Sequence, residues 1–131
     1  MGGLKTFLLT FCVIGSMAPP CVAMPDDMRE RAQVFATCLG RASAEMEHSW
    51  LMGDGAEAAQ DRRALFEMLL DTVAPRSGIP GPELLDMRIR AKFAQAHLLQ
   101  IAAFHTDPDR KRRAGAAARR AQRPCAALIM G

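Results

Sequence analysis

Residues 105–131 read HTDPDRKRRAGAAARRAQRPCAALIMG, and this stretch decides how the chain folds. It combines seven Lys and Arg residues with no acid after Asp109, yet it also contains Cys125 and has an apolar end. We therefore expect the stretch to form both the charged pole of the molecule and a covalent link to the rest of the fold.

A helix is predicted over 108–130. Thr106 or Asp107 can cap it, and Pro108 suits the first helical turn. Pro124 is expected to kink or break the helix just before the cysteine. One side of the helix carries small apolar residues and the cysteine, namely Ala114, Ala117, Ala118, Ala121, Cys125 and Leu128. The opposite side carries Arg112, Arg113, Arg119, Arg120 and Arg123.

The first 23 residues have the pattern of a secretory signal peptide. Lys5 precedes an apolar run over Phe7–Ala18, and small residues lead to Ala23, after which we expect cleavage. This run is well short of the roughly 20 residues that a membrane span needs. The sequence thus predicts export, to the periplasm or as a second choice to the medium, with no transmembrane span after cleavage. Arginine outnumbers lysine fourteen to three, which suggests a bacterial genome rich in G and C.

Cleavage leaves two of the four cysteines, Cys38 and Cys125. Because exported proteins fold in an oxidising compartment, we expect these two to form one disulfide. The bridge would enclose most of the chain, and the chain-entropy model gives it about 4 kcal/mol of stabilisation.

Three further helices are predicted from apolar residues that recur every three or four positions. They cover 27–52, 56–74 and 82–104. In the first, an apolar stripe ends at Trp50, while Arg41 is expected to face solvent. The third helix is apolar on two nearly opposite sides, one containing Leu85, Ile89 and Phe93. Such a helix is usually buried between partners, so we expect it to be the centre of the core.

Short connections between four helices predict an all-α fold, a small antiparallel four-helix bundle with one domain over 24–131. In this topology the start of the first helix and the end of the last lie at the same end of the bundle. The predicted fold and the predicted disulfide are therefore compatible.

Charge divides the chain unevenly. Residues 24–109 carry nine basic and fourteen acidic residues, a net charge of −5, whereas residues 110–131 carry seven basic residues and no acid, +7. We predict that the basic residues bind an anionic lipid surface or an acidic envelope protein; they are Arg110, Lys111, Arg112, Arg113, Arg119, Arg120 and Arg123. The alternative is a solvated helix face whose arginines pair with acids on the first two helices. Export, and the absence of aromatic residues among the arginines, argue against nucleic acid.

Catalytic signatures are absent from the sequence, so we expect a non-enzymatic protein with no cofactor and no metal. A metal-binding or catalytic bundle using His48, His97 or His105 remains an alternative, as does a disulfide-stabilised holdase chaperone. Glu45 and His48 have the Glu-x-x-His spacing of di-metal bundles, but that motif occurs once here and those sites need it twice.

Overall fold

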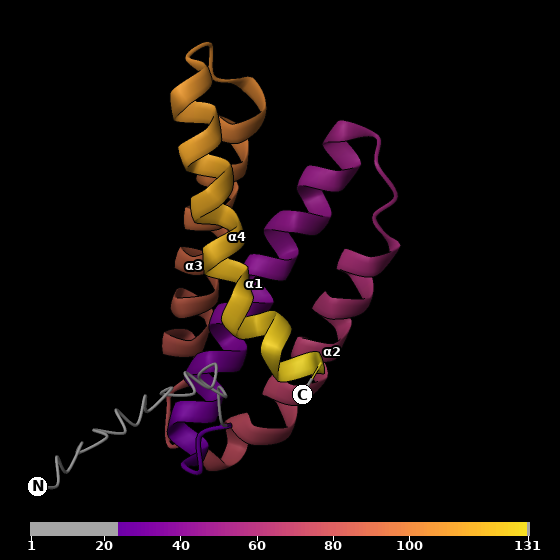
Figure 1. The fold of residues 1–131 in the computed structure, drawn as a ribbon. Helices are drawn as coiled ribbons and strands as arrows, with labels where there is room; N and C mark the ends of the chain where they lie inside the picture. The colour runs from indigo at the N-terminus through magenta and orange to yellow at the C-terminus, as the bar shows by residue number, and fades with distance from the viewer. Residues whose placement is uncertain (1–23, 131) are drawn as a thin grey trace, which may run out of the picture.

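The computed structural model describes residues 24–130, and the predicted signal peptide lies outside these residues. Within them the chain forms α1 (Met28–Met52), α2 (Glu57–Val73), the short 3-10 helix η1 (Ala74–Arg76), α3 (Gly81–Phe104) and α4 (Pro108–Met130). The four α-helices run alternately up and down (Figure 1). This arrangement confirms the predicted four-helix bundle, with helix bounds within one residue of those expected.

The ends of α1 follow from local chemistry. The Asp27 side chain accepts a hydrogen bond from the backbone N–H of Arg29 at 3.2 Å, so Asp27 caps the helix. At the other end Gly53 has φ 74°, in the left-handed region where a side chain would be strained. Both signals are local, which explains why the sequence predicted these ends.

The centre of the core is α1. Its buried residues cover about two thirds of the helix circumference, and many are small: Ala32, Phe35, Ala36, Cys38, Leu39, Gly40, Ala42, Ser43 and Ala44. Four of the small residues recur at every fourth position from Ala32 to Ala44. Gly40 shows the result, because a Cβ added there would lie 2.2 Å from the Arg88 carbonyl oxygen of α3. The backbones of α1 and α3 therefore approach each other closely at Gly40.

The prediction that the third helix forms the centre of the core is wrong. Only Leu84 and Gln95 of α3 are buried, whereas Leu85, Ile89 and Phe93 are exposed. One side of α3 packs against α1 and α4, but the second apolar side is only partly covered, because Leu85 and Ile89 border a groove next to α1 and α2. The sequence pattern predicts two apolar faces on this helix, and only one of them is packed against neighbouring helices.

The sequence also predicts the wrong environment for Trp50, which is 55% exposed and lies outside the core. Figure 1 shows the reason: the upper part of α1 leans away from α3 and α4, so its last turns have less cover.

The predicted disulfide joins α1 to α4. The sulfur atoms of Cys38 and Cys125 are 2.05 Å apart, and their Cα atoms 5.5 Å apart. Helix α4 does not break at Pro124 but continues to Met130. Figure 1 shows the lower, yellow part of α4 turning aside from the line of its upper part. The bend fits the effect of a proline inside a helix, whose ring removes a backbone donor and crowds the preceding turn.

Candidate functional site

The predicted binding residues lie on α4, and the start of this helix is fixed by Asp107. Its carboxylate accepts hydrogen bonds from the backbone N–H groups of Asp109 at 2.8 Å and Arg110 at 3.4 Å. The bond from Asp109 is the main cause of a lowered pKa for Asp107, and the bond from Arg110 and the charges of Arg113 and His105 act in the same direction. Of the two predicted capping residues, Asp107 is the one that caps.

The inner side of α4 orients the whole helix. Ala114, Ala118 and Cys125 are buried on it, as predicted. On α3, the buried Gln95 donates a hydrogen bond from Nε2 to the Ala118 carbonyl oxygen at 3.3 Å. Because small residues and a disulfide hold this side against the bundle, the opposite side must face solvent.

That opposite side is the outer arginine face, defined as Arg112, Arg113, Arg119, Arg120 and Arg123. All five residues are exposed. From the first to the last the face extends over about 16 Å of helix. Arg110 is exposed and Lys111 half-buried in the first turn. At about 100° per residue, these two point away from the outer arginine face and flank its beginning.

Within residues 24–130 the outer arginine face forms a single ion pair, between Arg112 and Asp109 of the same helix. Three of the seven acids of α1 and α2 pair with other cations, Glu67 with Arg63 and Arg88 among them. Glu45 lies 3.1 Å from Arg62, and Glu47 lies 2.6 Å from Lys92. Within residues 24–130 the outer arginine face therefore forms no ion pair with α1 or α2, but it is exposed to solvent, as the alternative also expects.

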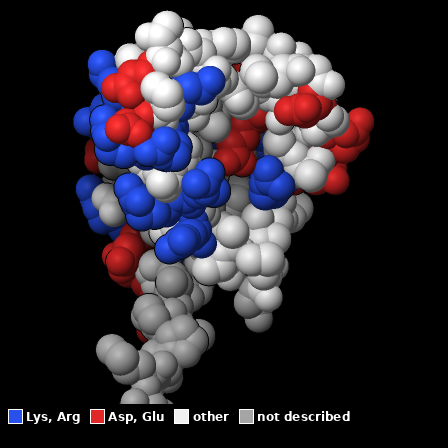
Figure 2. Space-filling model, turned by 45° about the horizontal axis from the view of Figure 1, so that its top comes forward, with Lys and Arg blue, Asp and Glu red and all other residues white. Residues whose placement is uncertain are grey.

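A space-filling view shows how these charges are distributed over one face of the molecule (Figure 2). In Figure 2 the blue side chains gather on the left of the molecule, where α3 and α4 lie, and red side chains stand apart on the right. Red side chains also lie within the upper part of the blue group, below it and beside its inner edge. The charge asymmetry predicted from the sequence thus appears on this face as a mainly basic region, with further acidic side chains on the other side.

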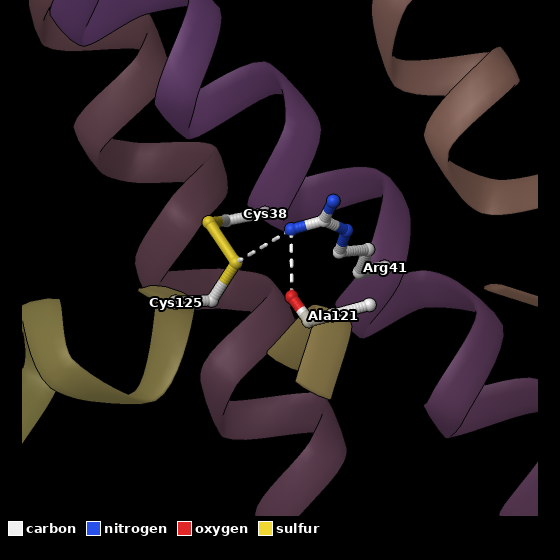
Figure 3. Close-up of a disulfide and its surroundings, with 4 residues drawn as sticks. All are labelled: Cys38, Arg41, Ala121 and Cys125. Carbon is white, nitrogen blue, oxygen red and sulfur yellow. Dashed lines mark hydrogen bonds between the residues drawn. A yellow bond between two sulfur atoms is a disulfide. The ribbon is translucent and has the colours of Figure 1, made fainter. Parts of the chain in front are cut away.

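Arg41 makes a contact that the sequence does not predict. It was expected to face solvent, but its Nη1 donates to the Ala121 carbonyl oxygen at 2.7 Å and lies 3.9 Å from the Cys125 sulfur (Figure 3). Burial lowers the pKa of Arg41 from its ordinary value. The long side chain of Arg41 extends from α1 to α4. Its guanidinium therefore contacts α4 next to the disulfide and the bend near Pro124. The spacing of residues along a helix predicts the face on which a side chain begins, but not how far a long side chain such as that of Arg41 extends.

The histidines are not brought together into a metal site. Across residues 24–130, no three His, Cys, Asp or Glu side chains are placed so that they could hold a metal ion. Glu45, the first residue of the Glu-x-x-His spacing, pairs with Arg62. His105 Nδ1 accepts a hydrogen bond from the backbone N–H of Asp107 at 2.9 Å, which places this side chain in the α3–α4 turn.

A groove of about 780 Å³ lies between α1, α2 and α3. Its apolar wall includes Trp50, Leu85 and Ile89. The sequence does not predict this groove, although the second apolar side of the third helix is the signal that points there. Its polar lining includes Glu47, Arg63, Arg88 and Lys92, and each of these charged side chains is engaged in an ion pair.

None of the helices from α1 to α4 contains a stretch both long and apolar enough to cross a membrane. Comparison of the chain with protein-family models, curated proteins and solved structures finds no match.

Proposed function

We propose that this protein is exported to the periplasm and works there as a non-enzymatic binding protein. It docks on an anionic surface through the outer arginine face of α4, with Arg110 and Lys111 adding charge at the start of the helix. The observation that carries the proposal is that four of the five arginines on this face have no carboxylate partner within residues 24–130.

Unpaired arginines favour a ligand outside the molecule. Basic residues near a negatively charged membrane surface contribute about 1 kcal/mol each, and salt screens this attraction. A guanidinium also matches phosphate and carboxylate oxygens with two parallel hydrogen bonds. Several such residues on one rigid helix give a binding energy that no single surface arginine provides.

The residues between the arginines favour a surface over a pocket. Ala116 lies within the face and Ala117 beside it, so only guanidinium groups project from this part of the helix. Between Arg112 and Arg123 there is no large apolar side chain to insert, so contact along this face would stay at the level of charged headgroups. Anionic phospholipid is therefore the surface that we expect, and an acidic envelope protein offers the same chemistry through carboxylates.

Export is part of the proposal and rests on the sequence. Residues 1–23 have the signal-peptide pattern, and the disulfide between Cys38 and Cys125 is of the kind that persists in oxidising compartments. Replacing Lys5 and the apolar run with polar residues should leave the protein in the cytoplasmic fraction, whereas the unaltered chain should be recovered, shortened, from the periplasmic fraction.

Co-sedimentation with lipid vesicles tests the docking face. We expect the purified chain to bind vesicles containing phosphatidylglycerol but not pure phosphatidylcholine vesicles, and to be released as salt rises from about 20 to 300 mM. The triple variant R113Q/R120Q/R123Q should lose most of this binding.

The matched control is R29Q/R76Q/R90Q, which removes the same charge from exposed arginines outside α4. It should retain binding. Equal losses in the two triple variants would mean that net charge, not the outer arginine face, is responsible, and the proposal would fail. If neither vesicle type binds, a pull-down from envelope extract at the same two salt concentrations tests the acidic-protein version. Failure to retain any protein in a salt-sensitive way would end that version too.

A further inference from the structure

We propose that a second copy of this chain docks on the open apolar face of α3, so that two α3 helices pack antiparallel about a two-fold axis. The open face of α3 is defined as Leu85, Ile89 and Phe93. This inference does not rest on the proposed function, because it uses a different surface of the molecule.

The open face is apolar and unusually exposed. Leu85 is 53% exposed, Ile89 41% and Phe93 68%. They recur at every fourth residue, so they form one ridge along about 12 Å of helix. Three large apolar side chains in a row are more than the scattered exposure that a soluble surface normally carries, and such ridges mark interfaces.

Position on the helix separates this ridge from the outer arginine face. Gln95 is bonded to Ala118 of α4, and Phe93 lies two residues earlier, about 200° around the helix. Phe93 therefore points away from α4. A surface that binds the arginines of α4 cannot at the same time cover the ridge of α3.

Antiparallel pairing of two copies makes the ridge complementary to itself. With the two-fold axis at Ile89, that residue faces its own copy, and Leu85 faces Phe93 of the second copy. Leu85 also lines the groove that contains Trp50. Each Phe93, the most exposed of the three, would then lie at the mouth of the other molecule's groove.

Charge along the ridge also fits a second copy. One flank carries Asp86 and Arg90, which pair with each other at 2.6 Å in the single chain. In a two-fold arrangement this flank meets itself, so Asp86 of each copy comes next to Arg90 of the other. The opposite flank carries the like charges Arg88 and Lys92, but Glu67 lies 3.9 Å from the first and Glu47 2.6 Å from the second. Both flanks can thus approach their copies without uncompensated charge.

Mass measurement by light scattering on a sizing column, over concentrations up to about 100 µM, tests the proposal. The full chain is expressed from its own N-terminus in a Gram-negative host and purified with its disulfide formed. We expect twice the monomer mass at high concentration, accompanied by a blue shift in the emission of Trp50, the only tryptophan. A chain that stays monomeric throughout, even one that then binds unfolded proteins or detergent through this face, overturns the proposal.

Two substitutions locate the interface. F93E and I89E should each weaken dimerisation at least about tenfold, because a charge would be buried at the centre of the contact. M68E is the control, since Met68 is exposed on α2 and lies outside the groove. A dimer that F93E and M68E affect equally would not be the one proposed.

Orientation is tested by charge exchange and by a cross-link. D86R and R90D should each weaken the dimer, and the double variant D86R/R90D should restore it, because both cross-copy pairs re-form with opposite sign. I89C should form an intermolecular disulfide under mild oxidation, since only a residue near the two-fold axis meets its own copy; M68C should not. Failure of both the rescue and the I89C cross-link rules out the antiparallel arrangement.

Discussion

The guanidinium of Arg41 on α1 donates a hydrogen bond to the carbonyl oxygen of Ala121 on α4 at 2.7 Å, one turn before Cys125. The two residues are eighty positions apart in the chain. The bond lies beside the disulfide and next to the bend near Pro124, where the helix lacks one backbone donor. A covalent link and a charged hydrogen bond therefore fix the second half of α4 together.

Removing this contact should destabilise the protein. R41M keeps much of the aliphatic chain but loses the donor, and we expect the free energy of unfolding in urea to fall by about 1–2 kcal/mol. R41K should lose less, because an ammonium group can still donate one bond. R119M, an exposed arginine of the outer arginine face, is the control and should change stability by less than about 0.5 kcal/mol. Equal effects of R41M and R119M would show that the Ala121 contact contributes nothing.

The disulfide should matter more than any single contact, because it closes a long loop. Its cysteines are 87 positions apart, and the chain-entropy model predicts that C38A/C125A lowers the free energy of unfolding by about 4 kcal/mol. Urea denaturation with and without reductant measures this loss. Reductant should destabilise the unaltered chain but leave C38A/C125A unchanged, and a loss below about 1 kcal/mol would contradict the model.

Close packing of α1 on α3 depends on Gly40. G40A places a Cβ 2.2 Å from the Arg88 carbonyl oxygen, a backbone atom that cannot simply rotate away. We expect the variant to lose about 1–3 kcal/mol in a thermal or urea unfolding measurement, even though alanine is the better helix former. G81A is the matched control, because a Cβ there meets nothing within 4 Å. Should G40A be as stable as G81A, the two backbones are not as close as the structure has them.

Capping of α4 by Asp107 should depend on pH. Backbone hydrogen bonds lower the pKa of its carboxyl group in the folded state. A lowered folded-state pKa means that the stabilisation is fully present above the unfolded pKa of about 4, and is lost as pH falls through the folded value. D107A should therefore melt at a lower temperature than the unaltered chain at pH 7, and the difference should shrink below about pH 4. A difference in melting temperature that stays constant from pH 7 to pH 3 would exclude this origin.

The helix ends are the part of the fold that the sequence predicts best. Asp27, Gly53, Asp107 and Pro108 act within one turn of where they stand, through caps, a left-handed glycine and a fixed proline φ. The disulfide followed from counting cysteines after the expected cleavage. The arginine side of α4 followed from the buried alanines opposite it.

The sequence by itself determined four helices, their ends, the cysteine pair and which residues of α4 could face outwards, because each depends on neighbours a few residues away. Tertiary structure alone decided that α1 and not α3 is the centre, since three helices can pack around a helix lined with small residues such as Ala36 and Gly40. It also decided that Arg41 turns inwards to α4 and that, within residues 24–130, four of the five arginines of the outer arginine face have no ion-pair partner. These outcomes depend on which segments, far apart in the sequence, lie close together in space. The spacing of residues along the chain does not determine this.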